Sequence, residues 1–336
     1  MSHRGREIRL RTRPEGLPAA SDFELVEVDL PDPEAGQVLV RNEWMSVDPY
    51  MRGRMRDEPS YADPWAIGAV MQGGAVGRVV ASGDEAFAAG DLVSSNLGWR
   101  DLAAGPAEAF TTLDPDVEDI ADYLGVLGMP GHTAYVGLLD LGQPREGETV
   151  FVSAAAGAVG SAVGQIAKLR GCRVIGSAGS PVKTSWIVDD LGFDAAIDYR
   201  SDDLEAALAE HAPDGIDVYF DNVGHDHLQA ALNHMNEHGR VVACGSIAGY
   251  NAADPQPGPN NLSHIVRKRL RVQGFIVSDH ADRRAAFLAD MRRWLAEGEV
   301  RSRQTVVEAL ERAPEAFLGL FDGSNVGKMV VRITSE

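Results

Sequence analysis

Apolar and polar residues alternate through the first third of the chain, in short runs that glycine and proline interrupt. We expect a first strand at residues 8–13, before a turn at 14–16. Residues 22–48 contain two runs around a Pro/Gly-rich turn, and residues 68–83 and 91–97 follow the same pattern. Alternation with a period of two predicts half-buried strands, and several short strands between tight turns predict a small barrel.

A different rhythm begins near Asp119. Residues 118–142 have a helical pattern that is broken at Met129–Pro130–Gly131, and from Thr149 onward short apolar runs alternate with amphipathic stretches. The pattern predicts strands at 149–154, 172–178, 195–199, 216–223, 239–246 and 271–279, and helices at 160–169, 181–191, 202–211, 226–236 and 281–297. Strands that alternate with helices of this length predict a parallel sheet wound on both faces, so the fold class is α/β. Residues 247–262 are a loop by composition, and residues 327–334 are a last strand.

Composition excludes several classes of protein. The formal net charge of −19 disfavours nucleic acid as a partner, because an acidic surface repels phosphate backbones. No apolar run is long enough to cross a membrane, and the basic start lacks the apolar segment of a secretory signal. The two cysteines, Cys172 and Cys244, fall in predicted strands, which favours reduced thiols in a cytoplasmic protein.

Glycines gather where the strand at 149–154 leads into the helix at 160–169. Gly157 and Gly160 permit a tight turn and a close approach of backbone N–H groups to a diphosphate, at the positive end of the helix dipole. Gly164 would let the helix pack closely on the sheet. The spacing GxxGxxxG differs from the usual GxGxxG, so the assignment depends on the strand before it and the helix after it. The alternative is a small-residue turn with no ligand.

The next strand indicates which dinucleotide binds. An NAD site usually carries an acid at the end of this strand, which binds the ribose 2′-hydroxyl. Residues 176–180 contain no acid, and Lys183, one of only four lysines in the chain, follows closely. The missing acid and the nearby cation favour NADP(H), whereas the alternative for Lys183 is a solvated surface residue.

Taken together, these stretches resemble the medium-chain dehydrogenase/reductase superfamily. Within it they are most similar to the zinc-free branch of leukotriene B4 12-hydroxydehydrogenases, prostaglandin reductases and NADPH-dependent curcumin reductases. The resemblance covers nearly the whole chain, and its most specific stretches are "GQVLVRNEWMSVDPYMRGRM", "GMPGHTAYVGL", "SAAAGAVGSAVGQIAKLRG", "YFDNVG", "VVACGSIAGYN" and "NVGKMVV". The sequence departs from the family at Ala75, where glycine is common, and at "GWRDL". Both departures concern the substrate side.

The resemblance implies a GroES-like, β-rich catalytic domain at 1–124 and 301–336, a Rossmann domain at 125–300, and reduction of a carbon–carbon double bond conjugated to a carbonyl. By position, it implies that Lys183 and Tyr199 meet the 2′-phosphate side of NADP(H). The other implied cofactor-binding residues are Gly157, Ala158, Val159, Gly160, Asn222, Cys244, Gly245, Ser246, Ile247, Tyr250, Phe275, Ile276, Val277, Asn325 and Gly327. It also implies a homodimer.

A metal is not expected. Zinc alcohol dehydrogenases share this fold but need cysteine, histidine and carboxylate ligands, and two cysteines in strands do not supply them. His225 and His227, and His234 and His238, fall on or near one helix in the predicted pattern, without an evident third ligand. These pairs are more often solvated than metal-bound.

Without a metal, the enolate charge that develops on the substrate oxygen needs hydrogen-bond donors. Tyr250, in the loop beside the carboxyl edge of the sheet, is our candidate donor, and Tyr50 would shape or support the pocket. For each, the alternative is a packed aromatic residue whose hydroxyl is satisfied within the protein. The leading hypothesis is thus an NADPH-dependent enone or 2-alkenal reductase acting on a small molecule. An NADPH:quinone oxidoreductase, or a cofactor-binding structural or regulatory protein with negligible turnover, remains open.

Overall fold

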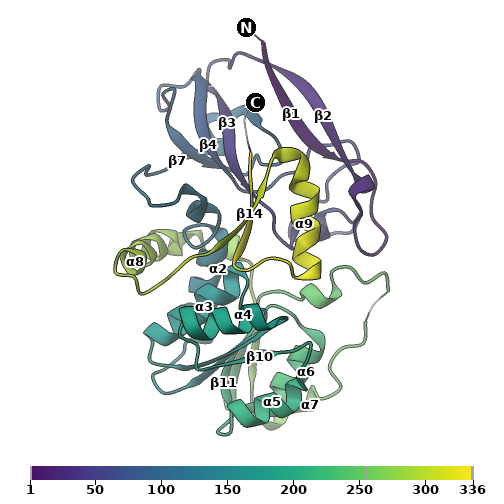
Figure 1. Ribbon diagram of the computed structural model, residues 1–336, viewed down its shortest axis with the longest axis vertical. Coiled ribbons are helices and arrows are strands. Elements are labelled where there is room, and N and C mark those ends of the chain that lie inside the picture. Colours follow the sequence, from purple (N-terminus) through teal and green to yellow (C-terminus); the bar gives the residue numbers. More distant parts are fainter. Residues whose placement is uncertain (1, 255, 334–336) are drawn as a thin grey trace. The chain divides into compact units, whose positions relative to one another are not determined.

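The computed structural model describes residues 2–254 and 256–333 (Figure 1). The chain forms two compact units. One contains the described residues up to Leu124 and from Gln304 onward, and the other contains Gly125–Arg303. Each unit has its own sheets and its own core.

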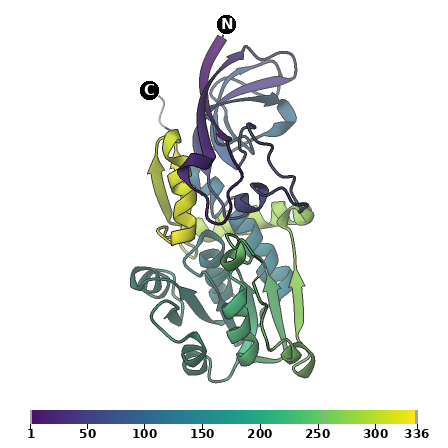
Figure 2. The ribbon, with the colours of Figure 1, turned by 90° about the vertical axis from the view of Figure 1, so that its right-hand side faces the viewer.

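The unit formed by Gly125–Arg303 is built on one parallel sheet, which Figures 1 and 2 allow the reader to follow. Among the described residues its strands are β8 (Thr149–Val152), β9 (Arg173–Ala178), β10 (Ala195–Asp198), β11 (Ile216–Asp221), β12 (Met235–Ala243) and β13 (Arg271–Gly274). They lie in the order β10-β9-β8-β11-β12-β13, and every neighbouring pair is parallel. The direction of winding therefore reverses between β8 and β11, where sheets of this kind bind their ligands.

Helices cover both faces of this sheet. They are α2 (Met129–Val136), α3 (Ala158–Leu169), α4 (Pro181–Ser185), α5 (Leu204–His211), α6 (His225–His234), α7 (Ser263–Arg267) and α8 (Arg284–Ala296). Phe151, Ile175 and Tyr219 project from successive strands into one core, where they pack with residues of α5 and α6. Helices α2 and α3 pack together, and α3 packs on β8 and β9. The predicted α/β fold with a doubly wound parallel sheet is confirmed.

Local boundaries differ from the predicted ones for identifiable reasons. The break expected at Met129–Gly131 is the start of α2, because proline is compatible with the first turn of a helix. The helix expected at 181–191 is α4 followed by a π-helical segment, Trp186–Asp190. The strand expected at 271–279 ends at Gly274, and a 3₁₀ segment begins at Val277.

The other unit contains an antiparallel pair of strands and a mixed sheet. Its described strands are β1 (Ser2–Leu10), β2 (Phe23–Pro31), β3 (Gln37–Ser46), β4 (Ala75–Ser82), β5 (Leu92–Ser95), β6 (Leu102–Pro106), β7 (Phe110–Thr112), β14 (Gln304–Glu308) and β15 (Lys328–Arg332). Strands β1 and β2 form an antiparallel pair, and the remaining strands form one sheet in the order β14-β15-β3-β4-β5-β7, with β6 paired to β3. Within the described residues, the structure therefore shows two separate sheets where the sequence predicts a small barrel.

The end of the chain returns to this first unit. Strand β15 pairs antiparallel with β3, so the predicted last strand is confirmed, although Thr334 of that prediction lies outside the described residues. Strand β14 pairs parallel with β15, and helix α9 (Ala313–Asp322) connects them, as Figure 1 shows. Neither β14 nor α9 was predicted; they are joined by Ala309 and a 3₁₀ turn, Leu310–Arg312, whose Leu310 is buried.

Aromatic side chains form the centre of the core of the first unit. The Trp99 ring is fully buried and stacks on Phe23, with ring centroids 5.9 Å apart. Phe317 of α9 meets the Trp99 ring edge-on at 6.1 Å. The C-terminal helix therefore contributes to the same core as the N-terminal strands, which is why this unit needs both ends of the chain.

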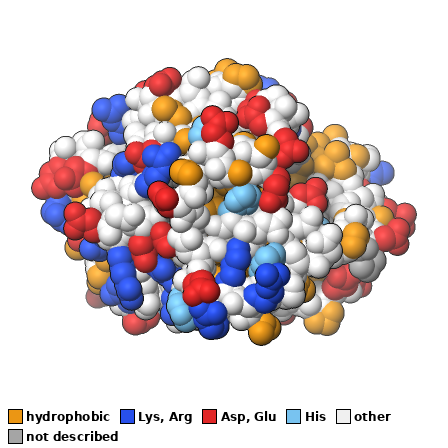
Figure 3. Space-filling view, turned by 90° about the horizontal axis from the view of Figure 1, so that it is seen from below, with side chains coloured by type: hydrophobic (Ala, Val, Ile, Leu, Met, Phe, Trp, Pro, Cys, Tyr) orange, Lys and Arg blue, Asp and Glu red, His pale blue; other side chains and the backbone are white. Residues whose placement is uncertain are grey.

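Charges of both signs are interspersed on the face of the molecule in Figure 3, and basic side chains there stand next to acidic ones. Within residues 2–254 and 256–333, no helix combines the length and the apolar character that crossing a bilayer requires.

Helix α3 lies close to a neighbouring side chain at Gly164. The close contact expected at this glycine was with the sheet, whereas the nearest atoms are those of the Phe193 ring. A Cβ on Gly164 would lie 1.8 Å from Cζ of Phe193, whose side chain is buried. We predict that Gly164→Ala lowers the free energy of unfolding by up to about 2 kcal/mol, because overpacking costs about 1–3 kcal/mol and the gain in helix propensity returns only about 1 kcal/mol.

Urea unfolding followed by circular dichroism measures this change. Gly53→Ala in α1 (Met51–Arg54) is the matched control, because a Cβ there meets nothing within 4 Å. A Gly164→Ala protein as stable as the Gly53→Ala protein would show that Phe193 yields without cost.

Candidate functional site

The turn between β8 and α3 has the geometry of a diphosphate site. Gly157, which precedes the helix, is extended (φ −88°, ψ 175°), and α3 starts at Ala158. A Cβ on Gly160 would lie 2.4 Å from the Ala154 carbonyl oxygen, so only glycine fits there. The first-turn N–H groups of Ala158, Val159 and Gly160 have no intrahelical acceptor, because no helical carbonyl precedes them. They are therefore placed to donate to a phosphate oxygen at the positive end of the helix dipole.

The carboxyl end of β9 brings Lys183 and Tyr199 to the same short segment. Residues 176–180 carry no acid. The Ser180 side chain caps α4 by accepting from the Lys183 backbone N–H at 3.4 Å, which places Lys183 in the first turn. A Cβ on Gly179 would lie 2.8 Å from the Tyr199 hydroxyl oxygen. A cation and a hydroxyl beside a segment without carboxylates suit a phosphate better than a ribose hydroxyl.

His227 supports Tyr199 and was not identified from the sequence in this role. The two rings meet edge-on, with centroids 5.1 Å apart, and Tyr199 is 40% exposed whereas His227 is 6% exposed. Burial lowers the pKa of His227 to about 4, so its imidazole is neutral at physiological pH. Its Nε2 atom is buried without a hydrogen-bond partner among the described residues. The imidazole thus supports the tyrosine ring as a neutral aromatic surface.

Where the winding of the sheet reverses, a buried carboxylate organises the loop after β11. One oxygen of Asp221 accepts from the Tyr219 hydroxyl at 2.7 Å and from the backbone N–H groups of Gly224 at 2.8 Å and Val223 at 3.0 Å. The Ser153 hydroxyl, at the end of β8, lies 3.3 Å from the same oxygen. Burial raises the pKa of Asp221 above its ordinary value, and these hydrogen bonds oppose that rise by stabilising the carboxylate.

The same network links three strand ends. Asn222 donates from its backbone N–H to the Ser153 hydroxyl at 2.9 Å and from its side-chain amide to the Ser153 carbonyl at 2.8 Å. The Asp221 carbonyl accepts from both N–H groups of Cys244–Gly245, and the Asn222 carbonyl accepts from Ile247 at 3.2 Å. The structure therefore brings Asn222 and the segment from Cys244 together beside the turn that follows β8.

Tyr250 follows a 3₁₀ turn, Ile247–Gly249, and folds back on the start of its own loop. Its hydroxyl oxygen accepts from the Ser246 backbone N–H at 3.4 Å, and a Cβ on Gly245 would lie 3.1 Å from that oxygen. Burial raises the pKa of Tyr250 above its ordinary value, so the phenol keeps its proton at neutral pH. In the bond from Ser246 the Tyr250 oxygen is the acceptor, so this bond does not use the hydroxyl proton. The geometry of this bond is therefore compatible with a hydroxyl that donates to a ligand.

Tyr50 lies in the other unit, at the start of α1. It packs against the aromatic core of that unit and is half-buried. Burial, reinforced by the charge of Asp48, raises the pKa of Tyr50 well above its ordinary value. Tyr50 is thus a protonated phenol whose ring is fixed by packing.

The remaining predicted residues occupy two separate segments. Phe275 follows β13, and a Cβ on Gly137 would lie 2.7 Å from its ring, so the ring fills space that only glycine leaves open. Phe275, Ile276 and Val277 are all half-buried. In the first unit, the Asn325 side chain donates to the Gly327 carbonyl at 2.9 Å, and Gly327 has a φ of +71°.

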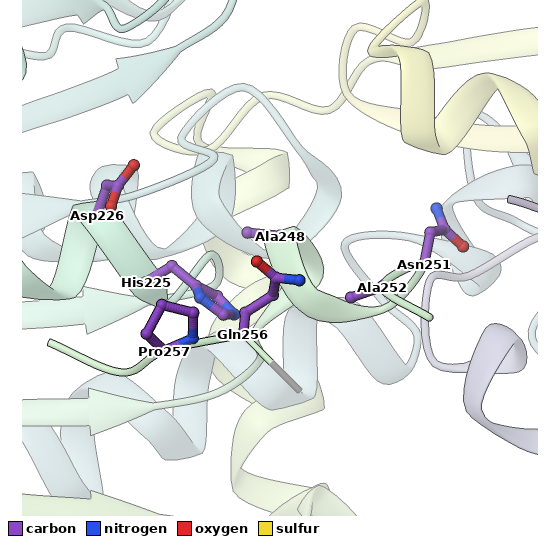
Figure 4. A pocket seen from close by; sticks show the side chains of 7 residues that line it. All are labelled: His225, Asp226, Ala248, Asn251, Ala252, Gln256 and Pro257. Carbon is purple, nitrogen blue, oxygen red and sulfur yellow. The ribbon is translucent and has the colours of Figure 1, made fainter. Parts of the chain in front are cut away.

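A hollow of about 530 Å³ opens next to the loop that contains Tyr250 (Figure 4). It is lined by His225, Asp226, Ala248, Asn251, Ala252, Gln256 and Pro257. None of the residues predicted individually to bind the cofactor or to take part in catalysis is among them. Ala248 lies in the predicted cofactor segment Cys244–Tyr250, so the hollow adjoins that segment and shares one residue with it.

The histidine and cysteine positions differ from the sequence-based placement. His238 is not on a helix with His234, because α6 ends at His234 and the chain enters β12 at Met235. Cys172 and Cys244 lie one residue outside β9 and β12, respectively, and both are free thiols. Burial raises their pKa values to about 11 and about 12, so both stay protonated.

Within the described part of the chain, no three histidine, cysteine, aspartate or glutamate side chains are grouped to hold a metal.

Sequence reasoning did not identify the residues that hold the site segments in place, such as Ser153, Tyr219 and Asp221. The available signal was an acid directly after a buried strand, in "YFDNVG". A second signal was a lysine inside the apolar stretch "GKMVV", which is Lys328. Both are charged residues in apolar surroundings, where a charge needs partners.

Known proteins resemble the chain over almost its full length. Residues 6–113 match the family described as the N-terminal domain of oxidoreductase, and residues 158–293 match the family described as zinc-binding dehydrogenase. The NADPH-dependent curcumin reductase of Escherichia coli is 44% identical, over 99% of this chain and 98% of its own. The NADP⁺-dependent 2-alkenal reductase of Nicotiana tabacum is 43% identical, over 98% of both chains.

A solved structure agrees with these sequence matches. CurA from Vibrio vulnificus in complex with NADPH superposes with a TM-score of 0.94, is 46% identical, and is covered over its whole length by 98% of this chain. The chain belongs to the medium-chain dehydrogenase/reductase superfamily, in the zinc-free branch that contains the prostaglandin and curcumin reductases.

Proposed function

We propose that the protein reduces the carbon–carbon double bond of small α,β-unsaturated ketones or aldehydes with NADPH. It is an NADP-dependent oxidoreductase of its family. The observation that carries the substrate proposal is that relatives more than 40% identical over nearly the full chain are named for curcumin and 2-alkenal reduction.

The turn after β8 fits the cofactor. A Cβ on Gly160 would collide with the backbone, so the glycine keeps the first-turn N–H groups of α3 open to a diphosphate. Lys183 and Tyr199 would bind the 2′-phosphate, since no carboxylate at residues 176–180 would repel it. In this proposal Asn222, the segment Cys244–Tyr250, Asn325 and Gly327 are cofactor-binding residues, and Phe275–Val277 line the nicotinamide side.

NADPH, when bound, supplies a hydride to the β-carbon of the substrate. The carbonyl oxygen then gains negative charge, and a fixed donor at that oxygen lowers the barrier. Tyr250 is the proposed donor, because its phenol is protonated and its oxygen is held by the Ser246 N–H. The enolate then takes a proton at its α-carbon, ultimately from water, so the net change is the addition of a hydride and a proton across the double bond. Tyr50 would shape the substrate pocket.

The first prediction concerns the reaction itself. The purified protein should oxidise NADPH when a simple enone such as 3-buten-2-one is added, with loss of absorbance at about 340 nm and a saturated ketone as product. A benzoquinone, tested in parallel, should react more slowly. Faster turnover with the quinone would replace the proposal by quinone reduction, and no turnover with either would leave a nucleotide-binding protein without catalysis.

The second prediction concerns the oxyanion donor. Tyr250→Phe should lower kcat for the enone about 100-fold or more, which is the usual effect of losing one such donor. NADPH affinity, measured by fluorescence titration, should change much less. Tyr123→Phe is the matched control, because that buried tyrosine bonds the Asp114 carbonyl in the other unit. Wild-type turnover in Tyr250→Phe would assign the phenol a packing role.

The third prediction concerns cofactor choice. Lys183→Ala should raise the KM for NADPH roughly 10- to 100-fold, because a hydrogen bond between charged groups contributes about 1.5–3 kcal/mol. The KM for NADH should change little, since NADH has no 2′-phosphate. Lys168→Ala on α3, where the lysine pairs with Asp194, is the control and should alter neither KM. Equal changes with both cofactors would place Lys183 among ordinary surface residues.

A further inference from the structure

One of the four lysines of the chain is buried. Lys328 is 5% exposed in β15, whereas lysines are rarely buried without a charged partner. Its ammonium group donates to Asp48 Oδ1 at 2.9 Å and to the Val47 carbonyl at 2.8 Å. Asp48 is 6% exposed, and its other oxygen accepts from the Ser46 hydroxyl. Both charges therefore have partners, in a site closed to solvent.

Stability alone does not account for this pair. Removing two charges from water costs about as much as their attraction returns, and apolar residues of similar volume are often equally stable in such positions. The exposed pair between Arg332 and Glu308, on the same strand β15 and on β14, shows that this sheet also carries ordinary surface ion pairs. The buried ion pair is therefore better evidence that two segments are held in position than that the fold is stabilised.

The pair joins the two segments of this unit that carry predicted site residues. Asp48 directly precedes Pro49–Tyr50, and its carbonyl accepts from the Met51 N–H at 3.1 Å, in the turn that sets the start of α1. Lys328 directly follows Gly327, whose left-handed backbone and bond from Asn325 shape the other segment. The hydrogen-bonded ladder between β3 and β15 begins at the pair Ser46–Val330. Asp48 and Lys328 lie beyond this end of the ladder, where their ion pair holds the two segments together.

We propose that Asp48 and Lys328 are positioning residues, whose buried ion pair fixes the Tyr50 turn and the Asn325–Gly327 segment relative to each other for enone reduction. The proposal rests on the proposed function. Neither side chain need touch the substrate, because each acts through the backbone next to it. A displacement of about 1 Å in such a segment is enough to lower turnover substantially.

Three variants separate positioning from stability: Asp48→Asn, Lys328→Met and the double variant. Each single variant leaves one buried charge without its partner, and we expect it to lower both Tm and kcat/KM for the enone. The double variant removes both charges, and its Tm should return to within about 3 °C of wild type. Its kcat/KM should nevertheless stay about tenfold or more below wild type.

Lys168→Met is the matched control, because it breaks a half-exposed lysine–aspartate pair in the other unit. It should leave kcat/KM unchanged. Recovery of both Tm and kcat/KM in the double variant would reduce the pair to a structural contact and overturn the proposal. Wild-type kcat/KM in both single variants would overturn it as well.

NADPH fluorescence titration separates failure of this proposal from failure of the proposed function. If the wild-type protein binds NADPH but reduces no enone, the proposed reaction is wrong, and positioning of Asn325–Gly327 is then judged from binding. In that case the double variant should bind NADPH at least about threefold more weakly than Lys168→Met. Equal affinities would overturn the positioning role independently of the reaction.

Discussion

The hydrogen bonds around Asp221 are the interaction on which the unit Gly125–Arg303 depends. Strands β8 and β11 are neighbours, but after β8 the chain continues toward one edge of the sheet and after β11 toward the other. The loops at their two carboxyl ends are therefore not joined to each other by a helix or a strand. A single carboxylate oxygen of Asp221 organises this region by receiving the Tyr219 hydroxyl and the N–H groups of Val223 and Gly224. Burial makes the charge costly, and the number of donors offsets that cost. The loops on both sides of the proposed cofactor site are consequently rigid without being regular.

Small residues are needed in the same region for a different reason. Gly160 keeps backbone atoms clear of Ala154, Gly164 accommodates the Phe193 ring, and Gly137 accommodates the Phe275 ring. In each case a Cβ would overlap a particular atom, which is more specific than a general preference for flexible residues. Gly160 and Gly164, which belong to one motif in the sequence, thus serve different purposes. Gly160 keeps the turn open at the proposed cofactor site, whereas Gly164, like Gly137 outside that motif, allows close packing.

In the unit that contains Asp48 and Lys328, a buried ion pair holds two segments together. In the unit Gly125–Arg303, hydrogen bonds to Asp221 have that role. The ion pair between Asp48 and Lys328 is closed to solvent, and it ties the turn before α1 to the start of β15. Residues that are nearly three hundred positions apart in the sequence meet there because β15 returns to β3. Both units therefore place buried charged groups beside the segments that are proposed to bind or act on ligands.

The sequence by itself determined the α/β class, the order of strands and helices from Thr149 to Ala243, and the glycine turn before α3. These follow from local causes, namely hydrophobic period, backbone freedom and helix capping. The same local reasoning extended the strand at 271–279 and the helix at 226–236 too far, because periodicity cannot show where a partner strand or a tertiary contact ends an element. Only the tertiary structure decided that Tyr199 rests on His227, that Asp221 gathers three strand ends, and that Lys328 is buried on Asp48. Such contacts join residues far apart along the chain, and their free energies depend on burial and geometry that no local pattern contains.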